Sequence, residues 1–253
     1  MIVWLYWIIS LTIVTYASSY IVRKYEKYGF AALTAFYTIY LGASQIIASR
    51  IINFDLGFYQ FFAPAAVFIY PFVAQAIDMI NEAYGKTKAH LAIFIAFITQ
   101  VLLVTFIAMV NSLSPAPFFQ FEEAWQSLFG LSIRITAASW MAFLVCQNLD
   151  AHVFAFLKRR YEKRVVMRSL TSDVLDLTLD SIIFVTIAFY GVMPIVPLII
   201  GQIISKNIIG FLDTPWFVWY KKMLTWKEIS FIPRGFLQRL KAKLGRYRLL
   251  MRV

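Results

Sequence analysis

Acidic and carboxamide side chains recur at helical spacing inside the apolar segments of this 253-residue chain. In YPFVAQAIDMINEAYGK, residues Gln75, Asp78 and Glu82 stand at positions i, i+3 and i+7, so they share one face of a helix, with Asn81 beside them. A carboxylate accepts two hydrogen bonds side by side, and a carboxamide both donates and accepts. The pattern therefore favours the binding of a small polar solute with several hydrogen-bond donors.

Two further segments carry the same kind of side chain. WMAFLVCQNLDAHVF places Gln147 and Asp150 on one helix face, and SLTSDVLDLTLDSIIF places Asp173, Asp176 and Asp180 at i, i+3 and i+7. We expect Asp180 to lie nearest the middle of its apolar segment. Asp173 stands near the start of the helix, where the helix dipole already accounts for a carboxylate.

A single lysine, Lys206, lies within the last apolar segment, GQIISKNIIGFLDTPW. If this segment crosses a membrane, inserting the ammonium costs about 2.5–3.5 kcal/mol, so Lys206 needs a carboxylate partner. Asp180 and Asp150 are both candidates for a structural pair; we expect Asp150 to be the partner and Asp180 to contact the solute. The candidate binding residues are Gln75, Asp78, Asn81, Glu82, Gln147, Asp150, Asp176, Asp180 and Lys206.

Several kinds of enzyme chemistry lack their sequence signatures. There is no P-loop, no HExxH and no GxSxG motif. Cys146 is the only cysteine and His90 and His152 are the only histidines, so neither an intrachain disulfide nor a cysteine-built zinc site can form. We predict that the chain is not an enzyme, has no catalytic residue, and uses no metal and no cofactor.

Membrane-spanning helices are the elements that position these residues. The chain is 61% hydrophobic and 15% charged, whereas a soluble domain is about 45–50% apolar and roughly 25% charged. A spanning helix needs about 20 mostly apolar residues. The predicted fold class is therefore all-α integral membrane, with seven transmembrane helices at 2–22, 30–51, 58–80, 89–112, 131–157, 170–191 and 195–220. The segment 113–130 is too polar to span, and its Trp125 fits a membrane interface.

The net charge of +11 is explained by basic residues that lie between and after these helices and orient them in the membrane. Along an alternating path, 21 of the 24 lysines and arginines fall on one side of the membrane, in 23–28, 86–88, 158–168 and 221–252. The positive-inside rule makes that side cytoplasmic, so the N-terminus lies outside and the C-terminus inside. The segment 222–253 is basic and amphipathic, which suits contact with the anionic lipid bilayer, and we expect no nucleic-acid partner.

Four stretches in order resemble the queuosine-precursor transporter family, which is similar in fold to the S-components of energy-coupling-factor transporters. They are YPFVAQAIDMINEAYGK, RITAASWMAFLVCQNLDAHVF, RSLTSDVLDLTLDSIIFVTIAFYG and SKNIIGFLDTP. The resemblance implies a six-helix core in 29–221, preceded in 1–28 by an extra N-terminal helix that we expect to pack peripherally. Asp173 and Asp176 stand where the family pattern has Ser or Thr and Ser, which leaves the exact ligand open.

The resemblance also implies a function in the plasma membrane. The chain would import a 7-deazaguanine base for tRNA modification salvage, such as 7-cyano- or 7-aminomethyl-7-deazaguanine, or queuine. It would act alone, or as an S-component with an ATPase energy-coupling module as partner. The alternative from another class is a non-transport membrane scaffold whose buried charges only hold helices together.

Overall fold

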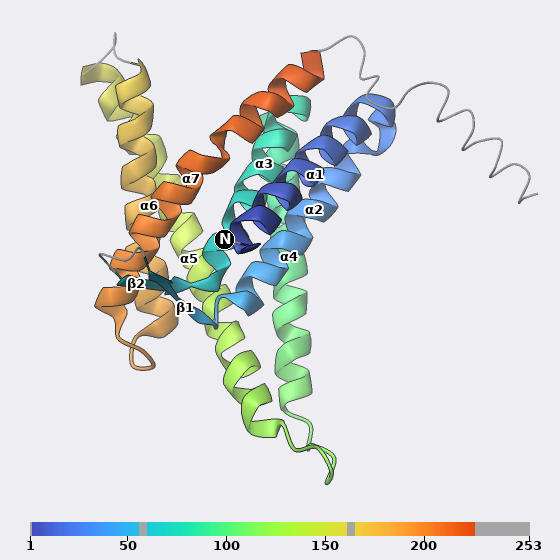
Figure 1. Cartoon of the computed structure of the whole chain (residues 1–253), viewed down its shortest axis with the longest axis vertical. Helices are drawn as coiled ribbons and strands as arrows, with labels where there is room; N and C mark the ends of the chain where they lie inside the picture. The colour runs from blue at the N-terminus through green and yellow to red at the C-terminus, as the bar shows by residue number, and fades with distance from the viewer. Residues whose placement is uncertain (1, 56–59, 161–164, 226–253) are drawn as a thin grey trace, which may run out of the picture.

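The computed structural model describes residues 2–55, 60–160 and 165–225, leaving aside the side chains of 2–3, 147–160, 165–173, 176 and 225. Seven α-helices and one β-hairpin follow one another in this part of the chain (Figure 1). They are α1 (Ile2–Lys24), α2 (Glu26–Ile47), β1 (Ile51–Asp55), β2 (Gln60–Pro64), the 3₁₀ helix η1 (Ala65–Phe68), α3 (Tyr70–Tyr84), α4 (Lys86–Asn111), α5 (Glu122–Arg160), α6 (Val165–Phe189) and α7 (Ile195–Thr225). The predicted all-α membrane class is confirmed.

Five helices in the described ranges are long and apolar enough to cross a membrane. These stretches are Trp4–Lys24, Glu26–Ile47, Lys86–Asn111, Glu122–Cys146 and Ile195–Leu224. Helix α3 has 15 residues, fewer than the about 20 that a complete span needs. The apolar stretch found in α6 is also short, running from Leu177 to Phe189. That α3 and α6 complete a set of seven spans therefore stays a prediction.

The connection between α2 and α3 differs from the prediction. Residues 51–64 form an antiparallel hairpin, so the helix predicted at 58–80 is wrong over its first part. Two prolines explain where the helix begins. Pro64 has an extended backbone with ψ of 137°, and Pro71 occupies the first turn of α3, where its missing N–H has no helix partner to lose.

The hairpin packs directly on α7 through a glycine. The backbone of Phe62 in β2 lies so close to Gly201 that a Cβ atom at Gly201 would overlap the Phe62 carbonyl group. Glycine permits this close approach because it has no side chain. The contact fixes the hairpin against the first part of α7.

Helix α5 begins earlier than predicted. It starts at Glu122, whereas the predicted span started at residue 131, so the end of the segment predicted to lie at an interface forms its first turns. Glu122 and Glu123 lie in the first turn, where carboxylates complement the helix dipole. Trp125 ties this end to α4, because its Nε1 donates to Asn111 Oδ1 at 2.8 Å. A polar segment can therefore still begin a long helix.

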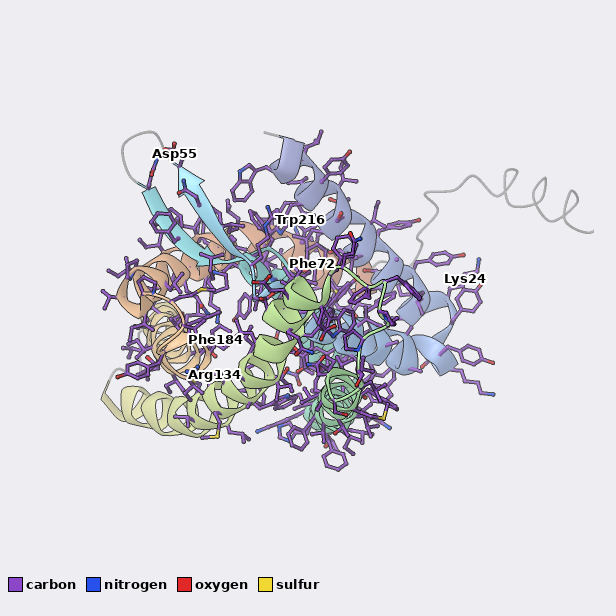
Figure 2. The ribbon with its side chains drawn as sticks, turned by 90° about the horizontal axis from the view of Figure 1, so that it is seen from below. Lys24, Asp55, Phe72, Arg134, Phe184 and Trp216 are labelled. Atoms are coloured by element: carbon purple, nitrogen blue, oxygen red, sulfur yellow. The ribbon has the colours of Figure 1, made fainter. Side chains whose placement is uncertain are left out.

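Arg134 links α5 to the end of α6 (Figure 2). Its Nε donates to the carbonyl oxygen of Ile187 at 2.6 Å, and its Nη2 donates to that of Tyr190 at 2.7 Å. The last carbonyls of a helix have no partner within the helix, so Arg134 satisfies one of them at Ile187 and also the carbonyl of Tyr190, which directly follows the helix. Ile135 and Phe184 belong to one buried apolar cluster that joins the same two helices.

Helix α1 is part of the packed body, which corrects the expectation that it packs peripherally. Its Trp7 and Leu11 are buried. Trp7 Nε1 donates to the carbonyl oxygen of Phe68 at 3.0 Å, and Trp216 Nε1 of α7 donates to Thr12 Oγ1 at 2.9 Å. The face of α1 that carries these side chains therefore packs on η1 and α7.

The ends of α1, α3 and α7 lie at the upper end of the bundle in Figure 1, and the last turns of α1 and α7 carry basic residues. Arg23 at the end of α1 donates to the carbonyl oxygen of Met223 near the end of α7, at 3.0 Å. Lys221 of α7 lies 3.1 Å from Glu82 near the end of α3. The ends of α1, α3 and α7 therefore lie together. This arrangement fits the predicted one-sided distribution of basic loops.

A reporter fused after Val253 is expected to give a cytoplasmic signal, because the positive-inside rule assigns this basic end to the cytoplasm. From residue 226 onward, the predicted basic tail lies outside the residues that the structure describes. The measurement compares a reporter that is active only in the cytoplasm with one that is active only outside. An extracellular or periplasmic signal after Val253 would contradict the predicted orientation of the whole bundle.

Candidate functional site

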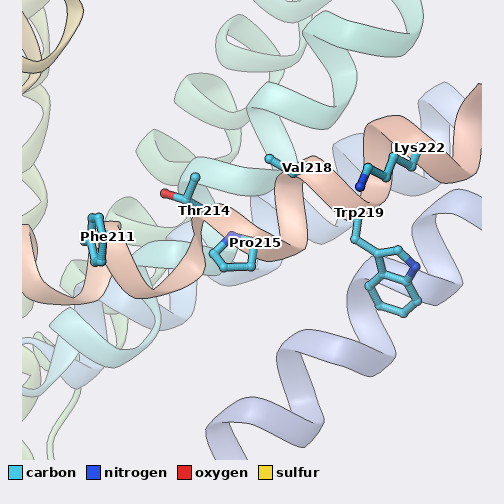
Figure 3. Close-up of a pocket in the computed structure, with 6 residues that line it drawn as sticks. All are labelled: Phe211, Thr214, Pro215, Val218, Trp219 and Lys222. Carbon is cyan, nitrogen blue, oxygen red and sulfur yellow. The ribbon is translucent and has the colours of Figure 1, made fainter. Parts of the chain in front are cut away.

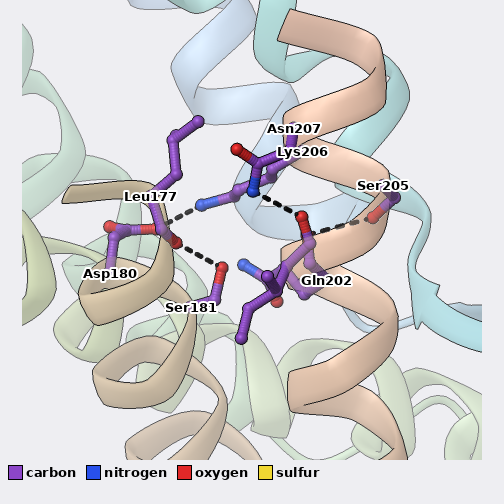
Figure 4. Close-up of polar contacts among 8 residues, drawn as sticks. Leu177, Asp180, Ser181, Gln202, Ser205, Lys206 and Asn207 are labelled. Carbon is purple, nitrogen blue, oxygen red and sulfur yellow. Dashed lines mark hydrogen bonds and ion pairs between the residues drawn. The ribbon is translucent and has the colours of Figure 1, made fainter. Parts of the chain in front are cut away.

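A buried ion pair joins α6 to α7 (Figure 4). Lys206 Nζ contacts Asp180 Oδ2, and the two side chains are 9% and 23% exposed. The same ammonium lies 4.8 Å from the ring centroid of Tyr70, the first residue of α3. An ammonium over an aromatic face is attracted to the ring, so three helices contribute to holding this charge.

Asp180, one of the two candidate partners of Lys206, makes this ion pair. The side chain of Asp150, the partner that we expected, lies outside the described residues. Helices α6 and α7 follow one another in the chain and are joined by the short connection 190–194. At about 1.5 Å per residue, Asp180 lies about 14 Å from the end of α6 and Lys206 about 17 Å from the start of α7. The two residues therefore meet at nearly the same depth.

Gln202 is a further polar residue at this site, and it was not in the predicted set. It is only 3% exposed, and its Oε1 has no hydrogen-bond partner in the described part of the chain. It stands four residues before Lys206, on the same helix face. This four-residue spacing from Lys206 is the signal in the sequence that identifies Gln202 as a candidate binding residue.

Gln75 connects three helices. It is 4% exposed, its Nε2 donates to the backbone carbonyl of Asp213 in α7 at 3.0 Å, and its Oε1 accepts a bond from Thr15 Oγ1 of α1 at 3.5 Å. Pro215 lies two residues further along α7, and a proline inside a helix removes one backbone hydrogen bond. Gln75 thus bonds to α7 close to Pro215, where the helix lacks one backbone hydrogen bond.

The other predicted site residues of α3 lie in the later part of this helix, toward its end beside Lys221. Asp78 and Asn81 are exposed, and Glu82 pairs with Lys221, the two side chains being 36% and 49% exposed. Lys206 contacts the first residue of α3, which lies twelve residues, or about 18 Å of helix, before Glu82. The structure therefore separates Glu82 from Lys206, whereas we predicted both as binding residues for one solute.

Three predicted site residues have side chains outside the described residues. Gln147 and Asp150 belong to the last part of α5, and Asp176 to α6. In Figure 1 these parts of α5 and α6 lead to the same end of the bundle as the tops of α3 and α7. Among the side chains that the structure does describe, no group of three or more His, Cys, Asp and Glu could hold a metal ion.

An apolar groove of about 490 Å³ runs along the opposite face of α7 (Figure 3). Its lining residues are Phe211, Thr214, Pro215, Val218, Trp219 and Lys222. Pro215 stands two and a half helical turns after Lys206, so the groove faces away from the ion pair. Most of its lining is aromatic or aliphatic, which suits lipid chains better than a solute rich in hydrogen-bond donors.

Comparison with known proteins gives one family match and two relatives. Residues 64–220 match the family described as "Putative vitamin uptake transporter". The chain is 24% identical over 207 residues to the "Probable queuosine precursor transporter" of Bacillus subtilis (strain 168), covering 80% of this chain and 90% of that protein. It is 27% identical over 164 residues to the "Queuosine precursor transporter" of Escherichia coli (strain K12), covering 62% and 67%. No solved structure matches the chain.

Proposed function

Because the chain belongs to the vitamin uptake transporter family, we propose that it imports a queuosine precursor across the cell membrane. The family consists of transporters and not of enzymes, and the long apolar helices make this chain a multi-pass membrane protein. Both relatives bear the name of queuosine precursor transporter. The proposed cargo is a 7-deazaguanine base such as 7-cyano- or 7-aminomethyl-7-deazaguanine, or queuine.

The pair of Lys206 and Asp180, buried against Tyr70, is the observation that carries this proposal. A guanine-type base presents a carbonyl acceptor beside a ring N–H donor. The Lys206 ammonium is a donor and the Asp180 carboxylate is an acceptor, so the pair offers the complementary edge. The ring of Tyr70 lies beside the ammonium and offers an aromatic face for the flat heterocycle.

The base can bind while the ion pair stays together. An ammonium has three donor hydrogens and a carboxylate has about four acceptor positions, whereas the contact between Lys206 and Asp180 uses one atom of each. Both residues keep capacity for a second partner. Binding a neutral base therefore does not require a buried charge to be left alone, which would cost several kcal/mol.

The remaining predicted residues are proposed to line the site or the route to it. From α5 and α6 these are Gln147, Asp150 and Asp176, and from α3 they are Gln75, Asp78, Asn81 and Glu82. Since the sequence contains no P-loop, import driven by ATP would need a separate ATPase energy-coupling module as partner. Facilitated or ion-coupled import would need no such partner.

Thermal denaturation of the purified full chain tests the proposed function. We expect 7-cyano- or 7-aminomethyl-7-deazaguanine to stabilise the protein, by about 2.7 kcal/mol at a hundredfold excess over Kd. Guanine and B-type vitamins serve as comparison ligands. The double variant Asp180→Asn/Lys206→Met is expected to bind roughly 10- to 150-fold more weakly, because it loses charged hydrogen bonds to the base.

The outcome that would contradict this function is the absence of stabilisation by any 7-deazaguanine. In that case the buried charges would only hold helices together, as in a membrane scaffold. Equal stabilisation of the parent and the double variant would instead show that the base binds elsewhere.

A further inference from the structure

Gln202 lies one helical turn before Lys206, on the face of α7 that is turned toward α6 (Figure 4). The residue is 3% exposed, yet Oε1 has no hydrogen-bond partner within the described ranges. A buried acceptor without a donor costs free energy, and the interior of a membrane has no bulk water to satisfy it. Such a group in a folded protein calls for a specific explanation.

The neighbouring donors make hydrogen bonds to other acceptors. Ser181 and Ser205 each have one hydroxyl hydrogen, and each donates it to a backbone carbonyl four residues earlier at 2.7 Å. Asn207 Nδ2 donates to a backbone carbonyl at 2.8 Å. The Lys206 ammonium is directed to Asp180 and to the ring of Tyr70. None of these donors bonds to Gln202 Oε1, so this acceptor is available to a donor group of a bound ligand.

Lys206, Asp180 and Gln202 together present one donor and two acceptors. A 2-aminopyrimidinone edge presents the complementary order of carbonyl, ring N–H and amino group. We propose that Gln202 is a specificity-determining residue whose Oε1 accepts a hydrogen bond from the exocyclic amino group of the bound base. Asp180 accepts from the ring N–H, and Lys206 donates to the carbonyl. This inference rests on the proposed function and adds the residue that distinguishes bases with a 2-amino group from bases without it.

The test measures the affinities of two ligands, 7-cyano-7-deazaguanine and its analogue without the 2-amino group. The parent protein is expected to bind the amino-bearing base about 10-fold more tightly, because the analogue leaves Gln202 Oε1 without a donor. In Gln202→Leu this ratio is expected to fall to near 1. Gln202→Met, with an unbranched side chain of similar length, is measured beside it, so that a folding defect of one variant does not decide the result.

Gln100→Leu is the matched control. Gln100 is 1% exposed, and its Oε1 is also without a partner among the described residues, but it lies on α4 against Gly42 of α2. The same substitution there removes the same kind of buried carboxamide from another part of the protein. We expect Gln100→Leu to keep the ligand ratio of the parent.

Two results overturn the role of Gln202 while leaving the proposed function intact. One is a parent protein that binds both ligands with equal affinity. The other is a ratio that stays at the parent value in folded Gln202→Leu or Gln202→Met, which would mean that another group or a buried water satisfies the carboxamide. If the parent binds neither ligand, the proposed function itself fails, and the role of Gln202 fails with it.

Discussion

Replacing Asp180 by asparagine is expected to lower the free energy of unfolding by about 3–5 kcal/mol. The Lys206 side chain is only 9% exposed, so removing the carboxylate leaves a largely buried ammonium without its charged partner. The ring of Tyr70 at 4.8 Å would remain, but an aromatic face supplies only about 2 kcal/mol to a desolvated cation. The measurement is thermal or denaturant unfolding of the purified variant in detergent.

The double variant Asp180→Asn/Lys206→Met separates the charge effect from the loss of packing. Removing both charges leaves no buried ion, so its stability is expected to return to within about 1–2 kcal/mol of the parent. Glu82→Gln is a control for the loss of an ion pair in general, because the contact between Glu82 and Lys221 is exposed and is worth less than about 1 kcal/mol. If Asp180→Asn is no less stable than Glu82→Gln, the ion pair does not hold α6 and α7 together.

Gly201→Ala is the second substitution with a large expected effect. The added Cβ would overlap the carbonyl group of Phe62, which belongs to the backbone and cannot move without moving the hairpin. We expect the free energy of unfolding to fall by about 3 kcal/mol, the upper part of the range for overpacked sites. The midpoint of thermal unfolding in detergent reports this loss.

Gly210→Ala on the same helix provides the matched control. A Cβ at Gly210 would meet nothing within 4 Å, and alanine is favoured over glycine in a helix by up to about 1 kcal/mol. The control is therefore expected to be as stable as the parent or slightly more stable. Equal stability of Gly201→Ala and Gly210→Ala would show that the hairpin does not rest on α7 as described.

The helices could be predicted from the sequence because long apolar runs in a chain of this composition are typical of membrane-spanning helices. The hairpin at 51–64 could not, because a short apolar run does not distinguish a strand from a helix. Pro64 and Pro71 were the available signals, since neither residue fits the interior of the single helix that we predicted there. The contact of Gly201 with Phe62 joins residues far apart in the sequence, and spacing along the chain does not reveal it.

The candidate site was predictable only in part, for a similar reason. The need of Lys206 for a carboxylate was correctly inferred. Which carboxylate meets it depends on the register between helices, and the packed structure shows Asp180 in contact with it. The unsatisfied state of Gln202 depends on how Ser181 and Ser205 use their hydroxyl groups, which only the packed structure shows.

The hydrogen bonds from Arg134 also bear on which helices can move together. Pulling α6 away from α5 would break two hydrogen bonds from the Arg134 guanidinium to backbone carbonyls, one of them partly buried. The contact between α6 and α7 contains instead an ion pair with unused donors and acceptors, which we propose that the solute occupies. We therefore expect α5 and α6 to move together as one arm. An alternation between outward-open and inward-open states would have its moving boundary between this arm and α7, along the row of Gln202 and Lys206.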